Sequence, residues 1–80
     1  MDRGRKYCNA FGDAVRKART KAGLTQEELA DRSGIDRSYI GGVERGERNP
    51  TLVVICKIAI GLGIQLNELV SYELPRENGD

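Results

Sequence analysis

The chain has 80 residues and a net charge of +1, with 39% hydrophobic residues, two cysteines and no histidine. This length predicts one domain, 1–80, whose small core needs compact helical packing or a partner chain. The composition argues against a zinc site and a disulfide framework, the absence of paired catalytic groups argues against an enzyme, and no apolar run reaches the roughly 18 residues of a membrane span.

The first helix is expected at residues 9–22, where Phe11, Val15 and Ala18 recur at helical spacing. Gly23 is expected to end it.

Charge is distributed unevenly along the chain. Residues 1–21 hold seven basic and two acidic side chains, whereas residues 51–80 hold two basic and four acidic ones. One end is therefore suited to a polyanion, although solvated helix faces would give the same pattern. The basic start is not followed by an apolar segment, so we expect no signal peptide and a cytoplasmic protein.

Two short helices are expected next, in "TQEELADRSG" and "DRSYIGGVE". Thr25 and Glu28 form a capping box, Gly34 suits a turn with positive φ, and Asp36 is the expected N-cap of a helix ending near Glu44. Two helices joined by a short glycine-containing turn are typical of a helix-turn-helix unit, here at residues 25–45.

The last two predicted helices differ in character. Thr51 caps "LVVICKIAIGL", which is apolar almost all round and is expected to be buried. Asn67 is the expected cap of a short fifth helix, "ELVSY", and residues 1–7 and 75–80 are expected to be flexible. The predicted fold is an all-α, compact five-helix bundle.

A resemblance to a known family rests on "LTQEELADRSGIDRSYIGGVERGERNPTL". This segment resembles the Cro/cI-type (XRE-like) helix-turn-helix DNA-binding regulators, and "DRSYIGGVERGERNP" most resembles the controller proteins of restriction–modification systems. The resemblance covers about residues 11–69 and implies a lambda-repressor-like fold and double-stranded DNA as partner.

The third predicted helix has two distinct sides. At 100° per residue, Ile40 and Val43 define the core direction. The opposite side consists of Arg37, Ser38, Gly41, Gly42 and Arg45.

A helix that enters the major groove turns its N-terminal residues toward base edges, and Arg is the commonest reader of guanine. The predicted base-reading residues are Arg37, Ser38, Gly41 and Gly42. The glycines are interpreted as removing bulk so that the helix lies deeper in the groove.

Phosphate contacts are expected around this surface, at the start of the second helix and in the loop after the third. The candidates are Thr25, Gln26, Tyr39, Arg45, Arg48 and Asn49. For Arg48 and Asn49 this role is what the family resemblance implies, and for Gln26 the resemblance implies it as well. Tyr39 could instead pack inward, and the loop arginines could simply be solvated.

The family resemblance also implies an ion pair between Arg19 and Glu44. Its expected role is structural, because it would join the first helix to the end of the third.

A dimerisation surface is expected at residues 62–74, since a small bundle cannot bury every apolar side chain there. Its candidates are Ile64, Leu66, Leu69, Val70, Tyr72 and Leu74. The alternative is that these residues only complete the core of one chain.

The sequence therefore predicts a transcription regulator that binds an inverted-repeat operator as a homodimer. RNA polymerase is a candidate partner, and no cofactor, metal or small-molecule ligand is expected. The alternatives are a phage-like or autoregulatory repressor and an antitoxin-type regulator that binds a protein.

Overall fold

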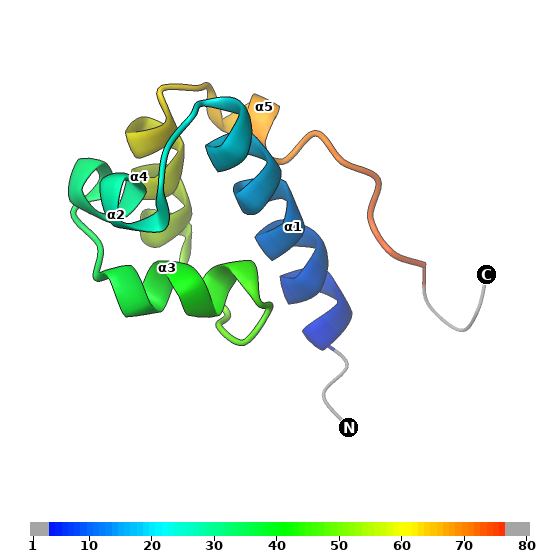
Figure 1. Ribbon diagram of the computed structural model, residues 1–80. Coiled ribbons are helices and arrows are strands. Elements are labelled where there is room, and N and C mark those ends of the chain that lie inside the picture. The colour runs from blue at the N-terminus through cyan, green and yellow to red at the C-terminus, as the bar shows by residue number, and fades with distance from the viewer. Residues whose placement is uncertain (1–3, 77–80) are drawn as a thin grey trace.

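The computed structural model describes residues 4–76 and contains only α-helices within that range (Figure 1). This confirms the all-α prediction. The elements are α1 (Arg5–Lys21), α2 (Gln26–Ser33), α3 (Arg37–Glu44), α4 (Leu52–Leu62) and α5 (Leu66–Leu69).

Side chains that cap helix ends set the limits of α2, α3 and α4, as predicted. Thr25 and Glu28 form both hydrogen bonds of the capping box at the start of α2. The carboxylate of Asp36 caps α3, and the hydroxyl of Thr51 caps α4. Gly34 ends α2 with φ of 70°, a left-handed conformation that glycine adopts without steric cost.

Helix α1 begins at Arg5, so the predicted start at residue 9 is wrong, as is the prediction of flexibility for residues 5–7. The Arg5 guanidinium donates to Asn9 Oδ1 and to the Arg45 carbonyl, each at 3.3 Å. The contact with Arg45 joins the first turn of α1 to the end of α3. Residues 1–3 lie outside the described part of the chain.

The C-terminal segment also differs from expectation. Helix α5 has four residues and begins after Gln65, which makes no side-chain capping bond, so the predicted Asn67 cap is wrong. Beyond α5, Tyr72 packs against the core and Lys6 Nζ donates to the Arg76 carbonyl at 2.7 Å. The chain is thus held against α1 as far as Arg76, although flexibility was predicted from residue 75; residues 77–80 are not described.

Every helix contributes to one core. The buried hydrophobic residues are Phe11, Val15, Leu29, Ala30, Ile40, Val43, Ile58, Ala59, Leu62 and Leu69. Helix α1 approaches α3 closely at Gly12, where a Cβ atom would lie 2.9 Å from the Glu44 carbonyl oxygen and still closer to that of Val43. A side chain at position 12 would separate the two helices.

Helix α4 is not buried all round, contrary to the prediction. Leu52, Val53 and Ile60 are 68%, 63% and 74% exposed. Val53 and Ile60 are seven residues apart and so lie on the same side of the helix. The prediction failed because five helices packed around one small core leave one side of α4 uncovered. No described helix has the length and apolar character needed to cross a lipid bilayer.

Candidate nucleic-acid interface

Helices α2 and α3 form the predicted two-helix unit, and α3 lies along one edge of the molecule, at the end opposite α5 (Figure 1). Ile40 and Val43 anchor α3 because both are fully buried or nearly so. The turn after Gly34 redirects the chain, and partly buried Ile35 packs against the core. The first turn of α3 is therefore exposed to solvent, while Ile40 and Val43 hold the helix against the core.

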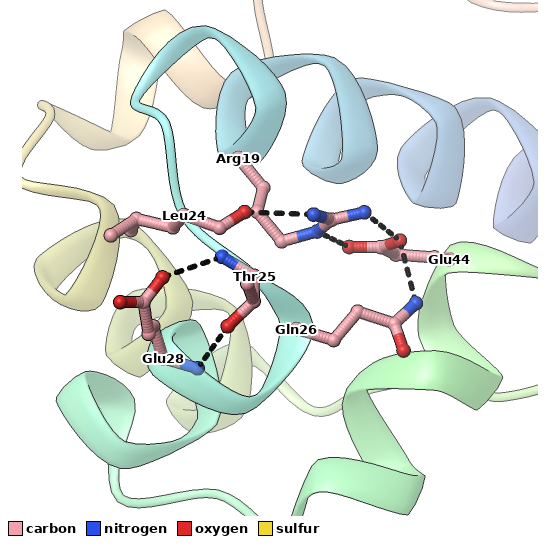
Figure 2. Close-up of polar contacts among 6 residues, drawn as sticks. All are labelled: Arg19, Leu24, Thr25, Gln26, Glu28 and Glu44. Atoms are coloured by element: carbon pink, nitrogen blue, oxygen red, sulfur yellow. Dashed lines mark hydrogen bonds and ion pairs between the residues drawn. The ribbon is translucent and has the colours of Figure 1, made fainter.

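A polar cluster joins α1, α2 and the end of α3 (Figure 2). Arg19 donates through Nε to Glu44 Oε2 at 2.6 Å and through Nη2 to Oε1 at 3.0 Å. Its remaining nitrogen, Nη1, donates to the Leu24 carbonyl at 2.8 Å. Arg19 and Glu44 thus form the ion pair that the family resemblance implied, and the contact is bidentate.

Burial makes this contact consequential. The Arg19 side chain is 16% exposed and the Glu44 side chain 3%. The hydrogen bond to Glu44 raises the pKa of Arg19 above its usual value, so the guanidinium remains charged. A buried carboxylate without this partner would be costly, which makes the pair a fixed joint between α1 and α3.

Gln26 is the third member of the cluster, and no sequence pattern indicated this contact. Its Nε2 donates one hydrogen to Glu44 Oε1 at 3.0 Å, and the second hydrogen of the amide is still able to reach a phosphate. The Thr25 hydroxyl accepts from the Glu28 N–H and keeps its own proton to donate. The phosphate contacts expected of both residues therefore stay predictions, and the backbone N–H groups at the start of α2 add further donors.

The first turn of α3 carries Arg37 and Ser38, which differ in whether their side chains already make hydrogen bonds within the protein. Asp36 accepts from the backbone N–H of Ser38 at 3.2 Å and also from its hydroxyl. The contact with the Ser38 hydroxyl, and after it the contact with the backbone N–H, lower the pKa of Asp36. Its carboxylate is therefore used to cap α3. Arg37 is exposed and has no hydrogen-bond or ion-pair partner among residues 4–76.

Gly41 and Gly42 are buried, so other side chains occupy the space that these glycines were interpreted as leaving open to the groove. A Cβ at Gly41 would lie 3.1 Å from Arg45 Nη1, and one at Gly42 would lie 2.9 Å from Arg48 Cγ. Both glycines do face away from Ile40 and Val43, but arginine side chains cover them. A helical wheel cannot show the cover over Gly42, because Arg48 comes from the loop beyond the helix.

The other expected phosphate contacts lie around the same edge. The Arg45 guanidinium pairs with Glu47 at 3.1 Å, with both side chains largely exposed. Tyr39 is partly buried against the core, and its ring has the Arg48 guanidinium carbon 5.4 Å from its centroid. Tyr39 thus packs inward, as one alternative had it, and a phosphate contact by its exposed part stays a prediction. Asn49 is exposed in the loop.

The predicted dimer residues divide into two groups. Leu69 is 2% exposed and belongs to the core, while Ile64 and Tyr72 are partly buried against it. The exposed hydrophobic residues are Leu52, Val53, Ile60, Leu66, Val70 and Leu74, which we call the apolar patch. Half of the patch comes from α4 and was missed, because a wholly apolar helix gives no periodic signal that separates its exposed side from its buried one.

A groove of about 690 Å³ separates α1 from residues 64–73. Its walls include Ala14, Lys17 and Tyr72, and no residue of α3 lines it. The groove is therefore separate from the surface that Arg37 occupies.

Comparison with known proteins links this geometry to one family. A helix-turn-helix family model matches residues 15–69. The chain is similar to control protein C.MunI of a Mycoplasma species (45% identity over 62 residues; 76% of this chain and 84% of that protein) and to C.SmaI of Serratia marcescens (42% over 70 residues; 86% and 83%).

A solved structure agrees with these relatives. The restriction–modification controller protein C.AhdI from Aeromonas hydrophila is 54% identical, with a TM-score of 0.77, over 79% of this chain and 96% of that one.

Proposed function

This chain belongs to the helix-turn-helix family of DNA-binding transcription regulators, and from that premise we propose that it is a cytoplasmic restriction–modification controller that binds an inverted-repeat operator as a homodimer. The observation that carries the DNA-binding surface is Arg37, an exposed guanidinium with no hydrogen-bond or ion-pair partner among residues 4–76, on the first turn of a helix anchored by buried side chains.

In this proposal α3 enters the major groove with its N-terminal end foremost. Arg37 donates two hydrogen bonds to O6 and N7 of a guanine. The Ser38 hydroxyl proton is directed to Asp36, so its oxygen is left to accept from an amino group of adenine or cytosine. These two residues would define part of each half-site.

Phosphate contacts would hold α3 in register. Arg45, Arg48 and Asn49 lie at the C-terminal end of α3 and in the following loop, and the backbone at the start of α2 supplies N–H donors. The Arg19–Glu44–Gln26 cluster sets the angle between α2 and α3, so that both helices meet the duplex together.

The homodimer is proposed from the apolar patch. Six large hydrophobic side chains are exposed among residues 4–76, Ile60 and Val53 among them, and exposed apolar surface is the kind of surface that interfaces bury. A two-fold axis through the patch would place two α3 helices about 34–36 Å apart, one turn of DNA. Occupancy would then respond to the concentration of the protein itself.

Footprinting of the DNA upstream of the chain's own gene tests the proposal. We expect two protected half-sites related by a two-fold axis, with centres separated by about one or two helical turns. A single asymmetric footprint would contradict the dimeric arrangement, and absence of any footprint at low salt would contradict operator binding. A footprint beside a promoter would make RNA polymerase the partner to test next.

The apolar patch also favours one alternative, an antitoxin-type regulator whose patch binds a different protein. Co-purification with the product of a neighbouring gene, at the expense of the homodimer, would support it. A phage-like or autoregulatory repressor would share the symmetric footprint and differ only in the genes beside it.

A further inference from the structure

We propose that Gly42 is a positioning residue for DNA binding: its lack of a side chain lets Arg48 lie flat on α3, beside the base-reading residues. This inference rests on the proposed function and deepens it. It replaces the interpretation in which the glycine only lets the helix approach the DNA.

The first step is the contact itself. A Cβ built at Gly42 would lie 2.9 Å from Arg48 Cγ, 3.2 Å from Nε and 3.6 Å from Cδ. The side chain of Arg48 therefore runs along the helix surface over much of its length. Because the nearest atom is Cγ, close to the base of the side chain, a small rotation at the far end cannot relieve the contact.

The second step is that the backbone of Arg48 cannot withdraw. The Glu47 N–H donates to the Gly42 carbonyl at 2.9 Å, and the Gly46 N–H donates to the Val43 carbonyl at 3.0 Å. These bonds fold the loop back onto the last turn of α3. A methyl group at position 42 would therefore force Arg48 into another rotamer.

The third step concerns what Arg48 gains from lying along α3 over Gly42, a position that we call the seat of Arg48. The Arg48 guanidinium carbon lies 5.4 Å from the centroid of the Tyr39 ring, within cation–π range. Tyr39 is itself packed against the core, so the guanidinium rests on a fixed support. Arg48 is thus ordered before DNA arrives, and binding does not require a freely rotating side chain to be immobilised.

Gly41 provides a matched comparison. A Cβ there would lie 3.1 Å from Arg45 Nη1, the far end of a flexible side chain, which can move by a few tenths of an ångström. Alanine at position 41 should therefore leave Arg48 seated, whereas alanine at position 42 should not.

The first test uses the free protein. Nuclear Overhauser effects between Arg48 side-chain protons and the Tyr39 ring should be present in the wild type and in Gly41→Ala, and lost in Gly42→Ala. Melting by circular dichroism confirms that both variants are folded. Persistence of these effects in Gly42→Ala would overturn the proposal that Arg48 needs a glycine at position 42 to lie beside Tyr39, whatever the DNA-binding result.

The second test is a double-mutant cycle on a fluorescein-labelled duplex from the DNA upstream of the chain's own gene. Gly42→Ala should weaken binding by about two- to tenfold, the cost of immobilising one long side chain. In an Arg48→Ala background the same change should have no effect.

The outcomes of the cycle are distinct. Equal weakening in both backgrounds would mean that the methyl group meets the DNA directly, and no weakening in either would mean that the seat has no role in binding; each overturns the proposal. If the wild type binds no duplex, the proposed function fails, while the free-protein test still decides whether the seat exists.

Discussion

Three arginine side chains lie on or beside the exposed side of α3, and they differ in what holds them. Arg37 has no partner among the described residues, Arg45 pairs with Glu47, and Arg48 rests on Tyr39. A guanidinium without internal partners can align both donors with a guanine edge, whereas an exposed ion pair such as Arg45–Glu47 is easily exchanged for a phosphate.

Arg37→Ala should weaken operator binding by about 1–3 kcal/mol and relax the base preference at one position of each half-site. The reason is loss of a bidentate contact to one base pair. Affinities measured on a panel of single-base operator variants would show this. Arg37→Lys is the control, because it keeps the charge and loses the two-pronged geometry. Uniform weakening on every duplex would reduce Arg37 to a phosphate contact.

At the scale of elements, the joint between α1 and α3 depends on two different features. Gly12 lets the helices touch, and the Arg19–Glu44 pair fixes their angle. The pair is not expected to be a large net source of stability, since burying two charges offsets much of their attraction.

Arg19→Met should lower the free energy of unfolding by about 3 kcal/mol, because Glu44 is left buried with only Gln26 as side-chain partner. The double variant Arg19→Met/Glu44→Leu should lose less than Arg19→Met alone. Urea unfolding measures both. Arg16→Met, which removes an exposed pair with Asp13 on the same helix, should change stability by less than about 1 kcal/mol. A double variant less stable than Arg19→Met would contradict this account.

The capping box of α2 predicts a dependence on pH. The Thr25 N–H donates to Glu28 Oε1 at 2.8 Å, and this bond is the main cause of the lowered pKa of Glu28. A carboxyl group whose pKa is lower in the folded state stabilises the fold at pH values above its unfolded-state pKa. This stabilisation is lost as the pH falls through the folded-state pKa. Glu28→Gln should therefore flatten the fall in melting temperature between about pH 5 and 3.

Glu27→Gln is the matched control for the capping box. Glu27 lies in the same first turn of α2 and is exposed, but it does not form the box. If Glu27→Gln flattens the pH profile as much as Glu28→Gln does, the effect comes from the helix dipole and not from the cap.

At the scale of the whole molecule, function is divided between two regions. The residues proposed to read bases lie on α3, and part of the apolar patch lies on α5 at the opposite end (Figure 1). The proposed dimer can therefore be disrupted without changing the residues proposed to contact DNA.

Ile60→Asp should leave the stability of a single chain nearly unchanged, because Ile60 is 74% exposed. It should weaken the dimer by about 2 kcal/mol or more, since a carboxylate would be buried without a partner. Sedimentation equilibrium at micromolar concentration measures this. Thr20→Asp, at an exposed position of α1, is the control. A wild-type protein that stays monomeric would refute the proposed homodimer.

Features that depend on neighbours in the chain were predictable. The Thr25–Glu28 box, the Asp36 and Thr51 caps and the left-handed Gly34 each follow from residues within one helical turn. The buried positions Ile40 and Val43 followed from helical periodicity for the same reason. The weak cap at α5 was misplaced because Gln65, Leu66 and Asn67 offer no decisive local signal.

The sequence by itself thus determined the helices, their caps and the side of α3 that the core occupies, because each depends on contacts within about one turn. Only the tertiary structure decided what covers the other side. Arg48 reaches Gly42 from a loop, Gln26 reaches Glu44 from another helix, and α4 keeps one side uncovered because none of the described helices packs there. Such contacts depend on how the loops and helices pack in space, and the periodicity of a single helix contains no information about that packing.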